Sequence, residues 1–293
     1  MTLTTDDYRL LNTIYIISKG RPQCKTAETL TRLNYPGQWF IVCGTNDETL
    51  PEYQKRWGED RVLVFDWKDE TTRTDTLDNF GFEVMPSGAV PVRNATIDIS
   101  RSRGERRHWQ FDDDYDTFWL TNANLVKKQH LRDGRKLQWW MCRIAKFADM
   151  CNLPNCGFAL TTIESTPNAA LTIGKRVFNA HNQSSEVATR WRGRLNDDLI
   201  NAIDTRRLGE KVEFSFRFLA LKMKDSQSES GGLSDIYKAE GTVRKSAYPI
   251  LIAPNAARLV VKFGRYHHKV RWDRLSPEII NEKFRKYRKD TGL

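Results

Sequence analysis

Three short apolar segments, each followed by a polar turn, alternate with helical segments in the first 65 residues. Residues 10–18, 39–43 and 61–65 are rich in Ile, Val and Phe, as expected of buried strands. Residues 23–33 and 48–57 are typical of helices, the second with Pro51 in its first turn, where proline is tolerated. This alternation predicts parallel strands joined by right-handed crossovers. We therefore expect an α/β fold: a single Rossmann-like domain with a mostly parallel central sheet and helices on both faces.

A fourth apolar segment, starting near residue 106 after a helix predicted over residues 89–101, ends in three consecutive aspartates, Asp112, Asp113 and Asp114. Neighbouring carboxylates repel one another and are costly to desolvate, so they require a cation or a water-filled cleft. Hard ions such as Mg²⁺ and Mn²⁺ take oxygen ligands and keep positions open for substrate phosphates. The pattern predicts a metal–phosphate site at the carboxyl end of a central strand. A solvated acidic turn is the alternative.

The remainder of the chain predicts further elements without a linker between them. Helices are expected over residues 131–152 and 276–290, and strands over 156–163, 175–180 and 210–223. Residues 68–86 and 225–234 have the composition of polar loops. We expect one domain over residues 1–275, followed by a basic C-terminal helix in residues 276–293.

Two later motifs carry candidate catalytic and metal-binding side chains. Asp197 and Asp198 begin a predicted amphipathic helix, where they either cap the helix or supply a general base that takes a proton from an acceptor hydroxyl. His267 and His268 follow an apolar strand at residues 259–263. Adjacent residues of a strand point to opposite faces, so at most one of them would join a metal bound by aspartate. A structural or surface role is the alternative.

Positive charge is concentrated in a few segments. The net charge is +10, and residues 258–293, 127–146 and 101–107 carry +7, +6 and +3, whereas the rest of the chain carries −6. Such segregation favours a polyanionic partner. A cleft for an anionic metabolite beside ordinary lysine-rich helices is the alternative.

Several function classes are disfavoured. Five cysteines without a CxxC pair favour reduced thiols and a cytoplasmic location. No apolar run approaches the ~18–20 residues of a membrane helix, and the amino terminus lacks a signal-peptide pattern. The sequence has no GxxxxGK[ST], no GxGxxG after the first strand and no GxSxG. The remaining chemistry is metal-assisted attack on, or departure of, a phosphate-bearing group.

The motifs, taken in order, resemble a known family. Ser-Lys-Gly-Arg-Pro at residues 18–22, the pair Arg93-Asn94, the three aspartates and Asn-Asp-Asp at residues 196–198 resemble GT-A nucleotide-sugar glycosyltransferases. Residues 231–237, 241–246 and 264–268 resemble the TET-associated glycosyltransferases of bacteriophages, and the resemblance runs from about residue 14 to residue 272. Ile17 departs from the pattern, since a proline often precedes the serine there.

The resemblance implies a GT-A-like fold and roles for individual residues. The nucleotide sugar would be bound by Ser18, Lys19, Arg21, Asp47, Asp66, Arg93, Asp112 and Asp113. Asp114, with His267 or His268, would hold Mn²⁺ or Mg²⁺, and Asp198 or Asp197 would be the catalytic base. DNA would be contacted by basic residues, namely Arg101, Arg103, Arg106, Arg107, Arg192, Arg271, Arg285 and Lys286.

The implied activity is a metal-dependent transfer of a sugar from a nucleotide-sugar, a UDP-sugar above all, onto the hydroxymethyl group of 5-hydroxymethylcytosine in DNA. The location would be the cytoplasm, that of an infected bacterium if the chain is of phage origin. Two alternatives stay open: a GT-A enzyme acting on a glycan, protein or lipid, and a DNA-binding relative without turnover. Trp139 and Trp140 are read as core residues, with base stacking as the alternative.

Overall fold

The computed structural model describes residues 2–77, 89–121, 128–160, 171–173, 176–186, 189–207, 214–223, 234–262 and 264–275. The helix predicted over residues 276–290, and with it the division of the chain at residue 275, lies outside the described residues, as does nearly all of the loop predicted at 225–234.

The amino-terminal alternation of strands and helices is confirmed. Its elements are α1 (Thr5–Leu11), β1 (Thr13–Ile17), α2 (Lys25–Arg32), β2 (Trp39–Gly44), α3 (Leu50–Trp57), a 3₁₀ turn (Glu59–Arg61) and β3 (Val62–Phe65). The first strand begins at Thr13 rather than at residue 10, because the preceding residues form α1. Thr4 caps that helix and makes reciprocal hydrogen bonds with Asp7, so the helix has its own start signal.

The chain continues through α4 (Trp67–Thr72), α6 (Ala89–Ser102), β4 (Arg107–Asp112), β5 (Tyr115–Thr121), β6 (Lys128–His130) and α7 (Gly134–Met150). Then follow β7 (Asn155–Leu160), β8 (Leu171–Ile173), β9 (His181–Ser184), α8 (Asp197–Arg207), β10 (Phe214–Met223), α9 (Ser234–Ile252), β11 (Ala257–Lys262), β12 (Arg265–Val270) and a 3₁₀ turn (Trp272–Arg274). Helices α6, α7 and α8 and strands β4, β7 and β10 match predicted elements.

The described residues build a ten-stranded sheet in the order β3-β2-β1-β4-β9-β7-β10-β5-β6, with β8 beside β10, and a separate two-stranded sheet of β11 and β12. Seven strands of the large sheet point in one direction, and β5, β8 and β9 run against them. The sheet is therefore mostly parallel, as expected, and its first four neighbours, β3 to β4, are parallel throughout.

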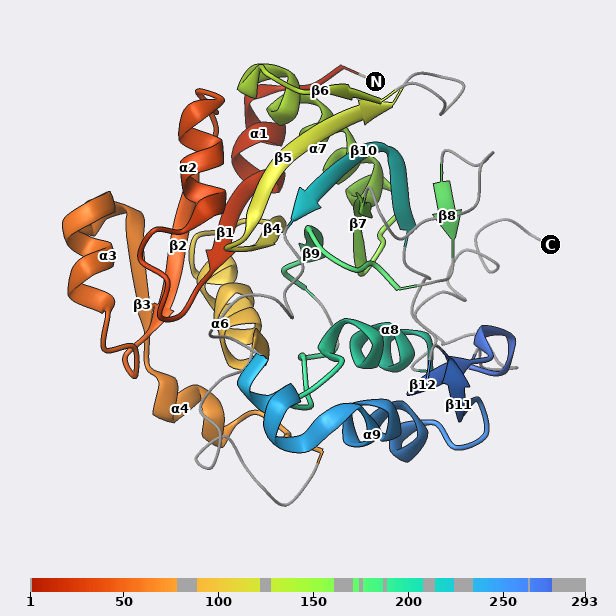
Figure 1. Ribbon diagram of the computed structural model, residues 1–293. Coiled ribbons are helices and arrows are strands. Elements are labelled where there is room, and N and C mark those ends of the chain that lie inside the picture. The colour runs from red at the N-terminus through yellow and green to blue at the C-terminus, as the bar shows by residue number, and fades with distance from the viewer. Residues whose placement is uncertain are drawn as a thin grey trace.

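Helices cover both faces of the sheet. Successive side chains of β1 point alternately to the two faces and show which helices pack on each. Ile14 and Ile16 pack into the main core, to which α2, α3 and α7 contribute. Tyr15 and Ile17 pack on the opposite face against Val92 of α6. Figure 1 shows α2 on one side of the β1–β4 region and α6 on the other. This arrangement confirms the α/β class.

A second, smaller core lies away from the sheet. Leu199, Ile200 and Ile203 of α8 pack against Tyr248 and Ile252 of α9. Residues of β12 and of the following turn cover the edge of this cluster. The elements that carry Asp197 and Asp198 thus have an apolar core distinct from that of β4.

Two predicted elements are wrong. Residues 175–180 were expected to form a strand, but residues 176–180 are irregular, and Ala180 has a left-handed φ of 52° directly before β9. Residues 68–86 were expected to form a loop, but residues 67–72 form α4, and residues 78–88 lie outside the described residues. Of the tryptophan pair, Trp140 packs against the main core, whereas Trp139 is 38% exposed.

Candidate active site

The candidate site lies at one edge of the sheet, where β1, β2, β3 and β4 end. Because these strands are parallel, their carboxyl ends meet at the same edge. Ser18, Asp47, Asp66 and Asp112 occupy these ends. The structure therefore brings the predicted nucleotide-binding residues to a common edge.

Two of these residues shape the edge through hydrogen bonds to the backbone. The Asp66 carboxylate accepts from the Asp69 N–H at 3.0 Å and caps α4. The Asp47 carboxylate accepts from the Gly20 N–H at 3.0 Å and from the Thr49 N–H at 2.9 Å. Gly20 has a φ of +67°, which a glycine adopts without strain, so Asp47 fixes the turn that carries the basic residues after β1.

That turn is also attached to Asp113. The Asp113 carboxylate accepts from Ser18 Oγ at 2.6 Å and from Arg21 Nη1 at 3.0 Å. The Tyr53 hydroxyl lies 2.6 Å from Ser18 Oγ and accepts from the Arg21 N–H at 2.8 Å. Lys19 Nζ lies 5.1 Å from the centre of a Trp67 ring. Asp113 thus gathers Ser18 and Arg21 at the site.

The aspartate turn itself is held against α2. Thr26 Oγ1 donates to the Asp112 carbonyl at 2.6 Å and accepts from the Tyr115 N–H at 2.9 Å. The Thr26 N–H donates to the Asp113 carbonyl at 3.0 Å. These bonds fix the backbone on both sides of Asp114, so the position of its carboxylate is set by the fold.

Arg93 connects the aspartate turn to α8. Its Nη2 lies 3.1 Å from Asp112 Oδ1, and its Nε lies 2.8 Å from Asp197 Oδ2. Burial opposes the charge, yet Asp112 and Asp197 raise the pKa of Arg93 above its usual value, so the guanidinium stays charged. Its Nη1 is buried without a hydrogen-bond partner in the described part of the protein. A buried guanidinium N–H without a partner can donate a hydrogen bond to an anionic ligand such as a phosphate.

The carboxyls of Asp112 and Asp114 are destabilised as anions. Burial, followed by the charges of Asp112 and Asp113, raises the pKa of Asp114 to about 8. Burial also raises the pKa of Asp112 to about 6, against the opposing effect of Arg93 and with the help of Asp197 and Asp113. Asp114 Oδ1 is buried and has no hydrogen-bond partner among the described residues. A cation beside Asp114 would reverse both effects.

The donor set fits a divalent cation that shares its coordination with a ligand. Within the described ranges, no group of three or more His, Cys, Asp or Glu side chains is arranged to hold a metal. Mg²⁺ and Mn²⁺ need few protein ligands, because substrate phosphates and waters complete their octahedral sphere. The buried Asp114 Oδ1, next to Asp112, can supply such a carboxylate ligand.

The histidines of β12 do not form a three-ligand group with Asp114 in the described part of the chain. His267 and His268 pair with Val260 and Leu259 of β11 and point to opposite faces of the hairpin, as expected. Burial, followed by the charges of Arg176 and Lys245, lowers the pKa of His268 to about 4. These cationic surroundings disfavour a divalent cation at His268.

Asp197 and Asp198 have different partners. Asp197 is paired with Arg93, whereas Asp198 Oδ2 lies 3.2 Å from Arg176 Nη1. Burial raises the pKa of Asp198, and Arg176 opposes that increase. A carboxylate in this state is suited to take up a proton. Both carboxylates have an arginine partner, and we take Asp198 as the candidate base because burial raises its pKa and its ion pair is the longer of the two.

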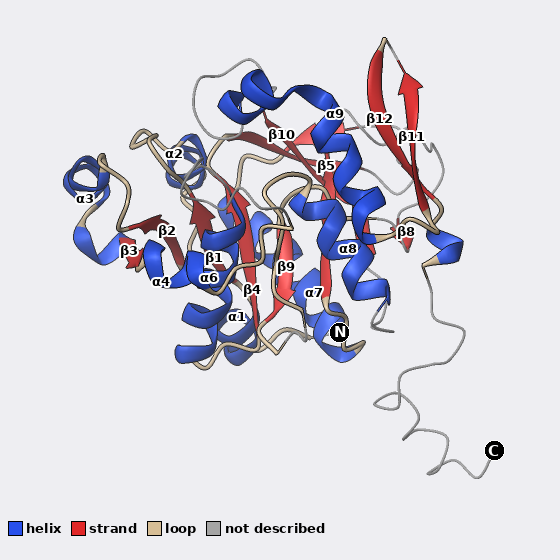
Figure 2. Ribbon diagram, turned by 90° about the horizontal axis from the view of Figure 1, so that it is seen from below, coloured by secondary structure: helices blue, strands red, loops and turns tan. Residues whose placement is uncertain are grey.

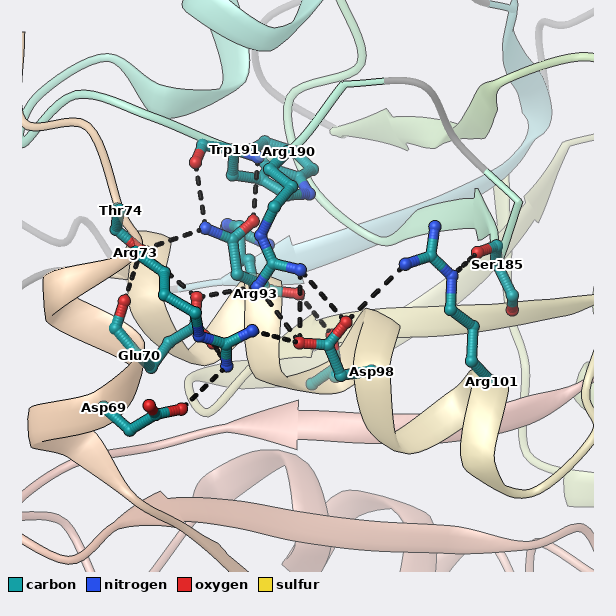
Figure 3. Close-up of polar contacts among 12 residues, drawn as sticks. Asp69, Glu70, Arg73, Thr74, Arg93, Asp98, Arg101, Ser185, Arg190 and Trp191 are labelled. Atoms are coloured by element: carbon teal, nitrogen blue, oxygen red, sulfur yellow. Dashed lines mark hydrogen bonds and ion pairs between the residues drawn. The ribbon is translucent and has the colours of Figure 1, made fainter.

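Residues on α6 fix the segment that leads to α8. Asn94 Nδ2 donates to the Trp191 carbonyl at 2.9 Å, and the Trp191 N–H donates to Asn94 Oδ1 at 2.8 Å. Next to this pair, Arg190 contacts Asp98 at 3.0 Å and Glu70 at 2.8 Å. Figure 3 shows this network between α4, α6 and residues 190–191. The network positions Asp197 opposite Arg93.

The basic residues at 101–107 lie at the opposite edge of the sheet from the aspartates. They precede β4, whose six residues span about 20 Å at ~3.3 Å per residue. Arg103 pairs with Glu105 at 3.2 Å, and Arg106 pairs with Asp149 at 2.9 Å. Arg101 Nη1 lies 3.7 Å from Asp98. Proximity in sequence to the aspartates therefore did not place these residues near them.

Arg107 is not available for DNA, contrary to the prediction. It is 2% exposed and donates to the Asn182 side chain and carbonyl and to the Leu153 carbonyl. Arg192 is paired with Asp204 at 2.6 Å and Asp75 at 3.2 Å, and Arg271 with Asp273 at 2.8 Å. Residues 285 and 286 lie outside the described residues.

Four residues of the site were missed from the sequence: Tyr53, Asn94, Arg176 and Lys245. Asn94 follows Arg93 directly and had a visible signal, since it forms part of the Arg-Asn pair. Arg176 and Lys245 come from distant segments, and no local pattern connects them with Asp198. Lys245 is identified by its surroundings: burial lowers its pKa, while Asp198 opposes the change.

The chain has detectable similarity to known proteins. A solved structure from Entamoeba histolytica, assigned as a UDP-N-acetylglucosamine pyrophosphorylase, is similar at 9% identity and a TM-score of 0.34, covering 85% of this chain and 86% of that chain. No curated protein sequence matches the chain. No helix in the described residues is long and apolar enough to cross a membrane. Residues 12–231, well over half of the chain, match the sequence profile of the TET-associated glycosyltransferases, and the chain therefore belongs to this family of glycosyltransferases.

Proposed function

We propose that the protein transfers a sugar from a UDP-sugar to the hydroxymethyl group of 5-hydroxymethylcytosine in DNA, with Mn²⁺ or Mg²⁺ as cofactor. The observation that carries the proposal is the pair of buried, unpartnered atoms at the carboxyl edge, Arg93 Nη1 and Asp114 Oδ1. One is a cationic donor and the other an anionic acceptor, and both belong to side chains that interact with Asp112. A metal diphosphate satisfies both at once.

The donor is accommodated along the carboxyl edge. Arg93 Nη1 donates to the diphosphate. Arg21, whose side chain is about a quarter exposed, is held at the same edge of the sheet by its ion pair with Asp113. When bound, the divalent ion offsets the negative charge that develops on the departing diphosphate. Ser18, Asp47 and Asp66 maintain the turns around the nucleotide.

The acceptor is activated by Asp198. Its carboxylate takes the proton of the hydroxymethyl group, the oxygen forms a bond to the anomeric carbon, and the bond from that carbon to the diphosphate breaks, releasing UDP. The raised pKa of Asp198 favours the proton uptake, and Arg176 at 3.2 Å opposes that increase by stabilising the carboxylate. This assignment applies to a reaction that inverts the anomeric centre.

The charge of the C-terminal region supports DNA as acceptor. Residues 258–293 carry +7, and neutralisation of phosphates supplies most of the non-specific affinity for DNA. A DNA acceptor also implies a cytoplasmic location in a bacterial cell. Trp139, partly exposed, lies on α7 and is not part of the proposed site.

The test is incubation with hydroxymethylated duplex DNA, Mn²⁺ and a panel of UDP-sugars, followed by digestion to nucleosides and mass spectrometry. We expect one donor to add a hexose or pentose mass to 5-hydroxymethyl-2′-deoxycytidine. Asp114→Asn should abolish the product, whereas the matched variant Asp116→Asn, whose carboxylate pairs with Lys25 at 3.4 Å, should retain it. A glycosylated lipid, peptide or glycan without modified DNA would refute the acceptor, and turnover in EDTA would refute the metal.

A further inference from the structure

The hairpin of β11 and β12 is a separate structural unit on the protein surface. It forms its own two-stranded sheet, unpaired with the large one in the described part of the chain. Figure 2 shows the hairpin standing out from the body next to α9. Its turn contains Gly264, with a φ of +70° and no atom within 4 Å of an added Cβ. Both strands are therefore accessible from the tip.

The strand register separates the hairpin into two faces. One face carries the directly opposed pairs Arg258–Lys269 and Lys262–Arg265, with Val260–His267 between them. Like charges opposite one another in an antiparallel pair destabilise it. An anionic partner would therefore stabilise this face of the hairpin.

The four cations of this face are not neutralised by any residue that the structure describes. Residues 257–272 contain no Asp or Glu. Arg258, Lys262, Arg265 and Lys269 are exposed and form no ion pair with any residue that the structure describes. The contrast is with Arg103 and Arg106, each paired with a carboxylate at 3.2 Å or less. Uncompensated charge is thus a property of the hairpin and not of the surface arginines in general.

The other face is apolar except for His268, and it is covered at its base. Ala257 is buried and Val270 packs against the small core of α8 and α9, whereas Val261 and Tyr266 near the tip are 68% and 49% exposed. Near its tip, the hairpin therefore exposes the apolar side chains of Val261 and Tyr266 on one face and the cations on the opposite face.

We propose that this hairpin enters the major groove of duplex DNA and holds the acceptor for the transferase; naming DNA rests on the proposed function. A two-stranded ribbon fits the major groove, which is about 12 Å wide. The substituent at C5 of a pyrimidine projects into that groove, where apolar side chains such as Val261 and Tyr266 can contact it. The four cations can reach the phosphates of the groove walls.

The hairpin is connected to the acceptor side of the active site. His268, on the α9-facing side of β12, lies close to Arg176 and Lys245, whose charges act on it. Arg176 in turn contacts Asp198 at 3.2 Å. Duplex DNA on the hairpin is thereby positioned relative to the proposed base rather than to the opposite edge of the sheet.

The experiment measures binding of the full chain to an unmodified duplex of 30 base pairs, by fluorescence anisotropy between 50 and 200 mM salt, without donor or metal. The variant is Lys262→Gln/Arg265→Gln, and the control with the same loss of charge is Arg103→Gln/Arg106→Gln. We expect the hairpin variant to bind at least about tenfold more weakly at 100 mM salt, with a salt slope smaller by about 2. The control should lose less than about threefold in affinity.

An unchanged salt slope in the hairpin variant, or an equal loss in the control, would overturn the proposal, and so would tighter binding to anionic lipid vesicles than to DNA. Thermal unfolding confirms folding, because removing a like-charge pair does not destabilise the hairpin. Turnover of free 5-hydroxymethyl-deoxycytidine should be unchanged in the variant. DNA binding that depends on the hairpin, with no glycosyl transfer to any acceptor, would refute the proposed function and leave the hairpin inference intact.

Discussion

The buried carboxyl of Asp114 should destabilise the ligand-free fold while serving the proposed function. Replacing Asp114 should therefore change stability and activity in opposite directions. Its carboxyl has a pKa of about 8 in the ligand-free fold, against 3.8 in the unfolded chain, because it is buried beside Asp112 and Asp113. A carboxyl of this kind binds a proton in the folded state over that window. The free energy of unfolding therefore falls as the pH rises from about 4 to about 8.

The size of the effect follows from the two pKa values. Each pKa unit corresponds to about 1.4 kcal/mol, so the raised pKa of Asp114 costs the fold about 5 kcal/mol at pH 8 and about 2 kcal/mol at pH 5. Asparagine has the same shape and does not ionise. We therefore expect Asp114→Asn to be more stable than the natural protein at pH 8, with an advantage about 3 to 4 kcal/mol larger than at pH 5.

Urea unfolding in EDTA at both pH values measures this difference, with Asp116→Asn as the control. Mn²⁺ at about 100 times its dissociation constant should then stabilise the natural protein by about 2.7 kcal/mol and leave Asp114→Asn unchanged. If Asp114→Asn is equally destabilising at pH 5 and pH 8, the carboxyl is not held as a buried, repelled acid, and the reasoning about this site fails.

Further changes address other parts of the site. Asp198→Asn should lower the single-turnover rate constant by at least about 10²-fold while UDP binding persists, and an unchanged rate constant would exclude Asp198 as the base. Asn94→Ala leaves the buried backbone N–H and carbonyl of Trp191 unpaired, so we expect a loss of about 2–3 kcal/mol in the free energy of unfolding, measured in urea. Arg107→Met should reduce stability by about 2 kcal/mol and leave the salt dependence of DNA binding unchanged; a reduced salt slope would restore Arg107 as a DNA contact.

The strands and helices at the amino terminus were predictable because local patterns decide them. The apolar runs that became β1, β2 and β3 are bounded by polar turns, and the parallel pairing of the strands brought their ends together as expected. Ser18, Arg21 and Asp113 were correctly placed at a common edge, since the topology determines that edge.

Elements decided by tertiary contacts were not predictable. Strand β9 has the sequence His-Asn-Gln-Ser and is buried in the middle of the sheet, where its polar side chains bond to neighbours such as Arg107 and Asn155. No strand propensity marks it, so the apolar residues just before it were preferred. Helix α4 was missed for a related reason: it is short and polar, and only the cap at Asp66 marks its start.

The basic residues at 101–107 lie far from the aspartates because helix α6 and the following strand β4 run in opposite directions. Helix α6 runs from the carboxyl edge to the amino edge of the sheet, and β4 returns. Arg101 to Arg107 lie at the turn between them. Although they are near Asp112 in sequence, the length of β4 separates them from it in space. Arg93, further away in sequence, is the residue that contacts Asp112.

Arg93 also connects the proposed donor site to the helix that carries the proposed base. Its guanidinium is shared by Asp112, on the large sheet, and Asp197, on a helix whose apolar core is separate. In the proposed reaction, a diphosphate bound at Arg93 Nη1 shares the guanidinium with Asp197, which is bound at Nε, and so changes the strength of the ion pair that holds α8 next to the sheet. Binding free energies are reciprocal, so an acceptor that orders α8 alters donor affinity by the same factor. In the proposed reaction, the affinities for donor and acceptor are therefore coupled through one buried side chain.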